Sequence, residues 1–392
     1  MMAIVYSCLS FPNFISCPIV NMAVKNISPR PCNLLGTIPY LSQKREFPLL
    51  AVASTCCPQI YEDHSESELR ALGVTFSGVG DSCVVRMALE NGSAANLMLP
   101  SGLITSFKAQ MWHGGTTEVL HTLVSERENG GAVIQGGLSL ALGCENNAGV
   151  SWSPNAWALH QVNGTPQESI QVELISRNEQ VNAQVKHIIT LRRDLLTSEI
   201  LVSNSSTSSL HISGSLICHL TVSTPDATYA IGLEGSDFFI RPPLVSNFSI
   251  IPPDLKGNDR DPRKSWAFNK LFSKLNARAW NAEDVVETLP RDIKEELEGE
   301  EDDNYKHLTE KSSRIYTNAP RNLTIMDRGR RNSVTVRRNG FEELYIFSPG
   351  SEHEWYNKYS FICISHAALL ESIILNAQTE WRGGLQLWNP NS

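Results

Sequence analysis

The chain has 392 residues, 41% of them hydrophobic, and a formal net charge of −8 at pH 7. This composition is typical of a globular protein with room for one large domain or two ordinary ones. The net negative charge makes nucleic acid and anionic lipid poor partners for the chain as a whole, and no segment approaches the ~18 uninterrupted apolar residues of a spanning helix.

The first 45 residues differ from the rest because they contain four basic residues and no acidic residue, so the remainder carries −12. They are also rich in Ser, Asn and Pro. This composition is typical of an organellar transit peptide, and the scarcity of Arg favours a plastid over a mitochondrion. We therefore expect a chloroplast transit peptide over residues 1–52 and a folded domain over residues 60–392. The alternative is a disordered cytosolic tail.

The nine cysteines include no C-x-x-C pair, and those of the body stand alone in apolar segments such as SLICHL and FICIS. They are predicted to be buried, reduced thiols in a reducing compartment such as a stroma. His113 and His121 have metal-ligand chemistry, but no second pair at a fixed spacing supports zinc. We predict no metal site.

From about residue 70 onward, short alternating segments are separated by turn signals such as NGS and PSG. Examples are SIQVELISRNEQ, SLICHLTVS, NSVTVRRNG and ELYIFSPG. Strands that recur at such short intervals, with few helical stretches, predict an all-β fold, a large antiparallel β-sandwich. A parallel α/β fold would need long amphipathic helices between the strands.

Residues 254–311 interrupt this pattern and are predicted to be a charged, partly helical insertion. WAFNKLFSKLNARAW has apolar residues at helical spacing and could present an amphipathic face, and KEELEGEEDDNYKH reads as a solvated, flexible surface. Aromatic residues concentrate at interface cores, although the helix could equally pack on its own sandwich. The interface candidates in this segment are Trp266, Phe268, Leu271, Leu275 and Trp280.

The order of the later segments resembles that of the galactose mutarotase-like superfamily, in particular the aldose and hexose-6-phosphate epimerases. RIYTNAPRNLTIMDRGRRNSVTVRRNGFEELYIFSPG, residues 314–350, is similar to the family's run of strands around a basic hairpin. SFICIS resembles its F-V-C-V-E strand, SLICHLTVS its A-L-H-T-Y-F segment, PNAWALHQV its H-G-F-A-R-N motif and IQGG its R-G-G turn. The resemblance covers roughly residues 70–390 apart from the insertion.

The resemblance also implies that the catalytic residues are missing. Epimerisation at the anomeric carbon needs a carboxylate base and a histidine acid, which the family takes from F-V-C-V-E and A-L-H-T-Y-F. Those positions hold Ser365 and Ile217 here. Asn155 replaces the His of H-G-F-A-R-N, and Gln135 replaces the Arg of R-G-G. We therefore predict no catalytic residues.

The segment WSPNAWALHQV, residues 152–162, is then interpreted as part of a former sugar pocket. The predicted remnants of this vestigial pocket are Trp152, Trp157, His160 and His219. Two alternatives remain open. His219, two residues beyond Ile217, could serve as a replacement acid in an active hexose or hexose-6-phosphate epimerase. The tryptophans could instead stack on a sugar in a carbohydrate-binding module.

The basic hairpin is the last candidate: Arg328, Arg330 and Arg331 could form a docking surface for an acidic partner, or simply a solvated hairpin.

A plastid-targeted, mutarotase-like chain without its catalytic pair resembles the non-catalytic subunits of this fold in subcomplex B of the chloroplast NAD(P)H dehydrogenase-like (NDH) complex. That resemblance implies a peripheral subunit on the stromal side of the thylakoid membrane, with no cofactor. Its partners would be other NDH subunits and, indirectly, photosystem I, in cyclic electron flow.

Overall fold

The computed structural model describes residues 66–79, 82–126, 132–252, 298–351 and 356–391, all within a compact unit that runs from Ser54 to Ser392. The predicted transit peptide, 1–52, lies outside the described residues. So do the five interface candidates between Trp266 and Trp280.

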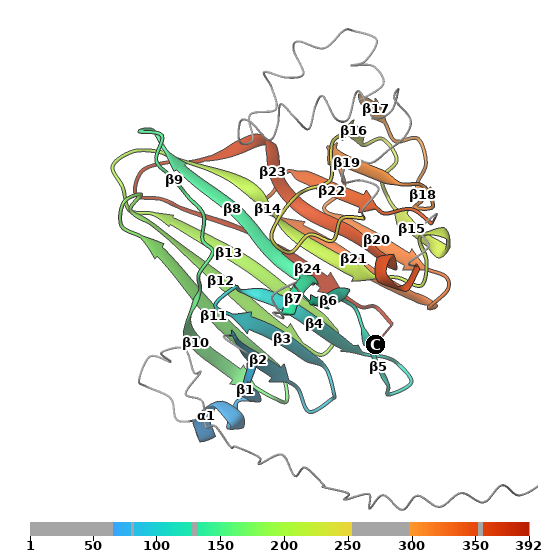
Figure 1. Cartoon of the computed structure of the whole chain (residues 1–392), viewed down its shortest axis with the longest axis horizontal. Coiled ribbons are helices and arrows are strands. Elements are labelled where there is room, and N and C mark those ends of the chain that lie inside the picture. The colour runs from blue at the N-terminus through green and yellow to red at the C-terminus, as the bar shows by residue number, and fades with distance from the viewer. Residues whose placement is uncertain (1–65, 80–81, 127–131, 253–297, 352–355, 392) are drawn as a thin grey trace, which may run out of the picture. The chain divides into compact units, whose positions relative to one another are not determined.

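The unit is built from two large antiparallel sheets, which confirms the predicted all-β sandwich (Figure 1). The first has thirteen strands in the order β1-β2-β3-β4-β8-β14-β23-β22-β19-β16-β17, with β5 on β4 and β9 on β8. Its strands are β1 Val74–Val79, β2 Ser82–Ala88, β3 Ala94–Leu99, β4 Leu103–Gln110, β5 Thr116–Glu118, β8 Leu138–Asn146, β9 Ser151–Trp152, β14 Leu210–Thr221, β16 Asp237–Ile240, β17 Glu298–Glu300, β19 Ser312–Thr317, β22 Glu343–Ser348 and β23 Phe361–Leu375.

The second sheet has nine strands in the order β10-β11-β12-β13-β24-β21-β20-β15-β18. These are β10 Ala158–Thr165, β11 Ser169–Asn178, β12 Ala183–Arg192, β13 Leu195–Asn204, β15 Thr228–Ile231, β18 Tyr305–His307, β20 Asn322–Asp327, β21 Asn332–Asn339 and β24 Glu380–Trp388. A separate hairpin and three short helices complete the described part: β6 Thr122–Glu126, β7 Ala132–Gly136, α1 Glu66–Ala71, η1 Pro225–Ala227 and η3 Tyr356–Tyr359.

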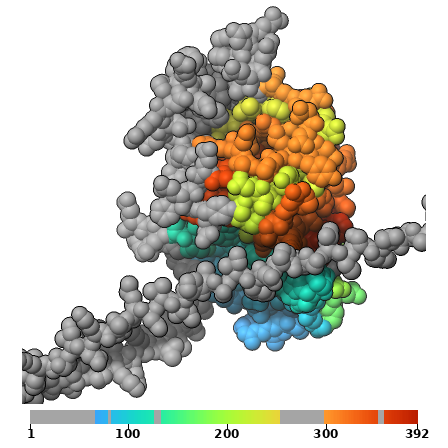
Figure 2. All heavy atoms as spheres, turned by 90° about the vertical axis from the view of Figure 1, so that its right-hand side faces the viewer, coloured from blue at the N-terminus to red at the C-terminus, as the bar shows by residue number. Residues whose placement is uncertain are grey.

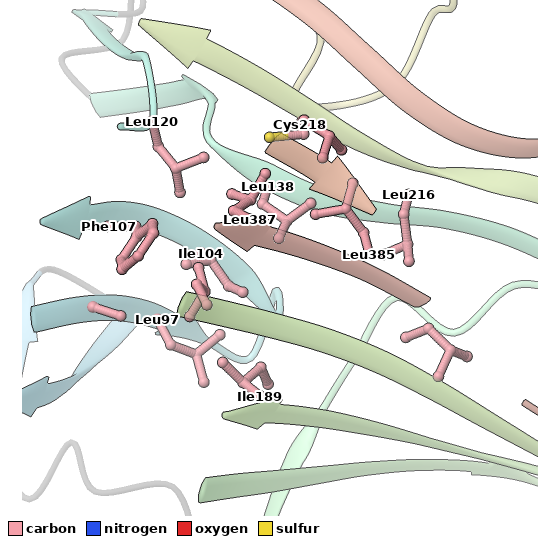
Figure 3. Close-up of a cluster of buried hydrophobic side chains, with 14 of the residues drawn as sticks. Leu97, Ile104, Phe107, Leu120, Leu138, Ile189, Leu216, Cys218, Leu385 and Leu387 are labelled. Carbon is pink, nitrogen blue, oxygen red and sulfur yellow. The ribbon is translucent and has the colours of Figure 1, made fainter. Parts of the chain in front are cut away.

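The main core lies between the two sheets. Figure 3 shows side chains of the first sheet, among them Phe107 and Leu216, facing Ile189 and Leu385 of the second. β12 illustrates the cause: its side chains alternate between the two faces, so every second residue is buried, as the period of a strand requires.

Three central strands of the first sheet break this alternation. All six residues of β22 are buried, as are the first eight of β23 and seven consecutive residues of β14 from Gly214 to Leu220. A strand covered on one face alternates, whereas a strand covered on both reads as a continuous apolar run. A second buried layer therefore covers the outer face of the sheet at these strands.

The predicted insertion extends too far toward the C-terminus. Residues 298–311 are not an interruption, because β17 pairs with β16 and β18 pairs with β15. Residues 253–297 lie outside the described part. Two short strands flanked by acidic residues lack the apolar alternation by which a strand is recognised.

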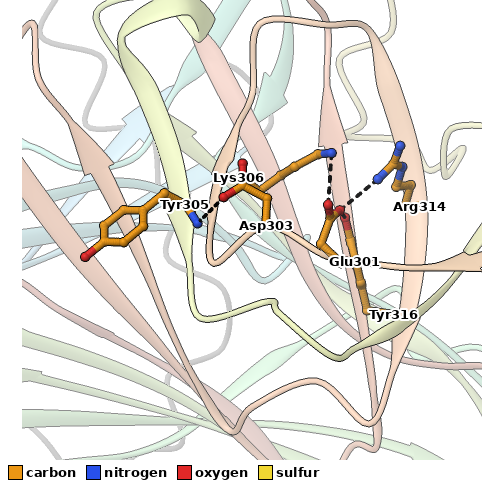
Figure 4. Close-up of polar contacts among 6 residues, drawn as sticks. All are labelled: Glu301, Asp303, Tyr305, Lys306, Arg314 and Tyr316. Carbon is orange, nitrogen blue, oxygen red and sulfur yellow. Dashed lines mark hydrogen bonds and ion pairs between the residues drawn. The ribbon is translucent and has the colours of Figure 1, made fainter.

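The expectation of a solvated acidic surface is also wrong for Glu301, which is only 2% exposed. Its carboxylate accepts hydrogen bonds from Arg314 Nη1 at 2.8 Å, Lys306 Nζ at 3.0 Å and the Tyr316 hydroxyl at 3.1 Å (Figure 4). A carboxylate can be buried when such partners replace its hydration. No helix in the described residues is long and apolar enough to cross a membrane.

Candidate functional site

The strand register brings together Ile217 and Ser365, the positions that the resemblance assigns to a former acid and base. Ile217 on β14 and Ser365 on β23 are direct cross-strand partners, and both are buried. The Ser365 hydroxyl donates to the Leu216 carbonyl at 2.8 Å. His219 and Cys363 are the next such pair on the same outer face. The two positions are therefore one place in this fold, and neither an isoleucine nor a hydroxyl bonded to a backbone carbonyl can act as an acid or base at neutral pH.

Apolar side chains fill the space around these positions. We call this set the outer cluster; it consists of Ile217, Ile250, Ile315, Tyr345, Phe347, Tyr359, Phe361 and Cys363. Phe361 is at its centre, with its ring centroid 5.2 Å from that of His219, 5.3 Å from that of His121 and 6.1 Å from that of Phe347. The outer cluster is the second buried layer inferred from the strands.

Residues 241–252, the covering segment, close the outer cluster from outside. Leu244 and Ile250 from this segment pack on it. The Leu244 amide donates to the Tyr345 hydroxyl at 3.2 Å, and the Ile250 amide donates to His219 Nε2 at 3.3 Å. In Figure 2 the residues leading up to 252, coloured yellow-green, lie at the surface beside the orange C-terminal strands. The segment is therefore bonded to side chains of the sheet beneath it.

Gln135 on β7 holds the same segment. Its Nε2 donates to the Ser249 carbonyl at 3.1 Å, and the Gly136 amide beside it donates to the Phe248 carbonyl at 2.7 Å. Gly136 has φ +85°, and a Cβ there would lie 2.2 Å from the His121 carbonyl oxygen. Only glycine fits so close a turn. The end of β7 thus anchors the backbone of the covering segment.

His219 is held neutral and is not placed to act as a general acid. Burial lowers its pKa to about 3, and it is 1% exposed. Because its Nε2 accepts the Ile250 N–H, the single proton of the neutral ring is on Nδ1. A general acid must carry its proton near the working pH and reach the substrate. His219 does neither.

The buried carboxylate of Glu343 on β22 is bonded to the backbone of β23. It is 4% exposed and accepts hydrogen bonds from the backbone amides of Leu369, Leu370 and Glu371, at 2.7–3.1 Å. The β14–β23 register shifts beside these residues, which leaves their amides without a ladder partner. Glu343 satisfies them and is thereby not positioned as a base.

The structure does not bring WSPNAWALHQV to this place, so its assignment to the vestigial pocket is wrong. Trp157 packs in the core between the sheets, with its ring 5.6 Å from that of buried His187. Trp152 is partly buried against that same core. Asn155 is exposed, and so is His160 on β10, at the edge of the second sheet. A large aromatic residue before a strand gives the same sequence pattern whether its side chain lies in a core or in a pocket.

The basic hairpin divides into one half-buried residue, Arg330, which clamps three acceptors, and two exposed residues. Arg330 donates to the Thr221 and Glu118 carbonyls, both at 2.9 Å, and to Thr117 Oγ1 at 2.7 Å. Its guanidinium is thus engaged within the protein. Arg328 and Arg331 are exposed, so the docking prediction stands for these two only.

No group of three or more metal-ligating side chains occurs in the described residues. All four described cysteines are buried, as predicted, and Cys144, Cys218 and Cys363 are free thiols. Burial raises the pKa of Cys144 to about 12, and a thiol protonated to that degree is a poor nucleophile or ligand.

The two-sheet architecture places the protein in the galactose mutarotase-like fold class. A putative mutarotase from Salmonella typhimurium aligns with a TM-score of 0.55 at 12% identity, over 84% of this chain and all of that one. A galactose mutarotase-like protein from Clostridium acetobutylicum aligns with a TM-score of 0.51 at 13% identity, over 82% of this chain and all of that one. At such low identity the likeness establishes the fold alone.

The particular family follows from a closer relative. The chain is 39% identical over 344 residues to the Arabidopsis thaliana protein "NDH-dependent cyclic electron flow 5". The alignment covers 87% of this chain and 86% of that protein. This chain belongs to the family of that protein. No general family model matches the sequence.

Proposed function

We propose that this protein is a non-catalytic structural subunit of the chloroplast NDH complex, in its subcomplex B, and that it supports assembly of the complex for cyclic electron flow around photosystem I. The observation that carries the proposal is the outer cluster. Apolar side chains surround Ile217 and Ser365, the positions that the resemblance assigns to the acid and base, and the covering segment is bonded over them. The name of the Arabidopsis relative supplies the link to NDH-dependent electron flow.

The outer cluster argues against an epimerase in two ways. Ser365 donates its only hydroxyl proton to a backbone carbonyl, and Ile217 has no polar atom. A sugar hydroxyl placed among such residues would lose its hydration without gaining a hydrogen bond. A carbohydrate-binding role would need an accessible aromatic platform, and Trp157 is only 4% exposed.

The proposed location is the stromal side of the thylakoid membrane, as a peripheral protein. The partners would be other subunits of subcomplex B and the membrane arm, with photosystem I an indirect partner. In this role the mutarotase fold acts as a rigid scaffold, and neither a cofactor nor a metal is required.

A native gel tests the proposal. Thylakoids are solubilised in mild detergent and the protein is located with an antibody. Migration in a megadalton-sized complex, together with loss of the other subunits of that complex when the gene is disrupted, supports a structural subunit. Migration as a free monomer would contradict it. A parallel polarimetric assay of purified protein should show hexose mutarotation at the spontaneous rate.

A further inference from the structure

One end of the second sheet presents two exposed tryptophans among exposed arginines. The turns β12–β13 and β20–β21 and the last residue of β24 all lie there, because Leu195 and Thr335 both pair with Trp388. The β4–β5 turn of the first sheet joins them, as the C-terminus beside β5 shows in Figure 1. We call this surface the arginine–tryptophan end; it consists of Trp112, Arg193, Arg328, Arg331 and Trp388.

Hydrogen bonds hold the C-terminal residues against two of these turns. The Trp112 amide donates to the Asn391 carbonyl at 2.8 Å. Asn391 Nδ2 in turn donates to Asn332 Oδ1 at 2.8 Å and to the Ser333 carbonyl at 3.0 Å. The β4–β5 turn and the β20–β21 turn are therefore tied to the same short segment.

The β12–β13 turn is tied to the same platform. Trp388 Nε1 donates to Asp194 Oδ2 at 2.9 Å, and Arg193 Nε donates to Gln110 Oε1, at the end of β4, at 3.1 Å. The Arg330 side chain joins the β20–β21 turn of the second sheet to β5 of the first sheet, because it donates to two residues of β5. The five residues thus stand on one ordered surface, although four separate parts of the sequence contribute them.

The local charge of this surface is opposite to that of the chain. Its three arginines are exposed, and within the described residues none of them forms an ion pair. Of the nearby acids, Asp327 is buried and Asp194 is half-buried, whereas Asp226 is exposed, so the exposed arginines outnumber the exposed carboxylates.

At the margin, Arg192 pairs across the strands with Ser169, next to Glu168, so these two exposed charges offset each other. The exposed positive charge thus belongs to Arg193, Arg328 and Arg331, and the guanidinium of Arg328 lies over the Tyr229 ring, 4.6 Å from its centroid. A protein with a net charge of −8 here exposes more arginines than carboxylates, and such an excess favours an acidic surface at this end.

The aromatic residues give the same surface an apolar anchor. Trp112 is 78% exposed and Trp388 is 41% exposed. The backbone of Trp112 is nonetheless fixed by Asn391, so little conformational freedom remains to be lost on binding. Tryptophan and arginine are the residues most enriched in interface hot spots.

We propose that the arginine–tryptophan end is a docking surface for an acidic face of a neighbouring protein subunit, with Trp112 entering an apolar depression there. This rests on the proposed function and specifies the chemistry of the partner. Arg328 and Arg331 supply charge, whereas Arg330 only positions the hairpin. The end lies on described, ordered elements and is independent of residues 253–297.

The test expresses variants of the full chain in plants that lack it. The triple variant Trp112→Ala, Arg193→Glu, Arg328→Glu is compared with a matched control, Ile374→Ala, Arg177→Glu, Arg337→Glu. Both sets remove one exposed apolar side chain and reverse two exposed arginines. Thermal unfolding of the purified proteins must show that both variants are folded. Their unfolding midpoints should lie within about 2 °C of each other, because exposed substitutions alter stability little.

The readout is the fraction of the protein that migrates with the megadalton complex. This fraction should be at least about tenfold smaller for the test variant than for the control, as expected for loss of a hot spot. Equal migration of test variant and control would overturn the inference while leaving the proposed function intact. Failure of the wild-type chain to migrate with the complex would overturn both.

A vesicle assay separates a protein partner from a lipid surface. Purified protein is sedimented with phosphatidylglycerol vesicles at low salt. Little binding, equal for the wild type and both variants, supports a protein partner. Strong binding that only the test variant loses would overturn that assignment in favour of an anionic membrane surface.

Discussion

Replacing Phe361 with alanine tests whether the outer cluster is a real core. Phe361 is fully buried and contacts three other rings, so its truncation removes apolar contacts and leaves a cavity. The expected loss is about 3–5 kcal/mol in the free energy of unfolding. For a unit of about 340 residues, the entropy of unfolding is about 0.7 kcal/mol/K, so the midpoint should fall by about 4–7 °C.

Differential scanning calorimetry of the purified domain measures the shift. Ile374→Ala on the same strand is the control; Ile374 is 62% exposed, and its truncation should change stability by no more than about 0.5 kcal/mol. If Phe361→Ala melted within 1 °C of that control, the covering segment would not close a packed layer, and the reasoning would fail. The variant should also gain no mutarotase activity, because a cavity supplies neither acid nor base.

Three further predictions concern other parts of the molecule. Glu301→Gln should cost about 2–3 kcal/mol because it leaves Arg314 and Lys306 without their buried counter-charge, whereas exposed Glu300→Gln should be neutral in the same urea titration. Arg330→Ala should destabilise by about 2–3 kcal/mol through three orphaned acceptors, and Arg331→Ala should not; equal midpoints would refute the clamp. Acid pH tests the buried imidazoles of His187, His219 and His366. Burial lowers their pKa to about 3, so below pH 6.5 the unfolded chain binds protons that the native state does not, and stability should fall by about 4 kcal/mol between pH 6 and 5. Urea midpoints independent of pH over that range would contradict it.

The fold class could be predicted from the sequence because apolar and polar residues alternate along a strand with a period of two. This period does not depend on tertiary detail. β12 is recognisable by this criterion. The juxtaposition of Ile217 and Ser365 also followed from the order of the segments. The outer cluster did not, although ELYIFS and FICIS are continuous apolar runs of the kind that a strand covered on both faces requires.

Other features could not be read from the sequence, for physical reasons. The tryptophans near residue 155 were assigned to a pocket because the sequence does not state which of two sheets a strand joins. Glu301 stands in an acidic run, and only the fold brings Arg314 and Tyr316 to it. Trp112, Arg193 and Arg328 belong to three separate turns, so no spacing rule could have grouped them.

The covering segment closes over the outer cluster, and its opening has a different energetic cost from that of an enzyme's active-site loop. An enzyme's loop opens by breaking a few contacts with water ready to replace them, and such regions lie at the low-stability end of a protein. Here, opening would break the bonds of Leu244 and Ile250 and expose the rings of Tyr345 and Phe361 to water. Amide hydrogen exchange at Leu244 and Ile250 should therefore be nearly as slow as exchange in β14 and β23, and the covering segment should exchange only when the strands beneath it unfold.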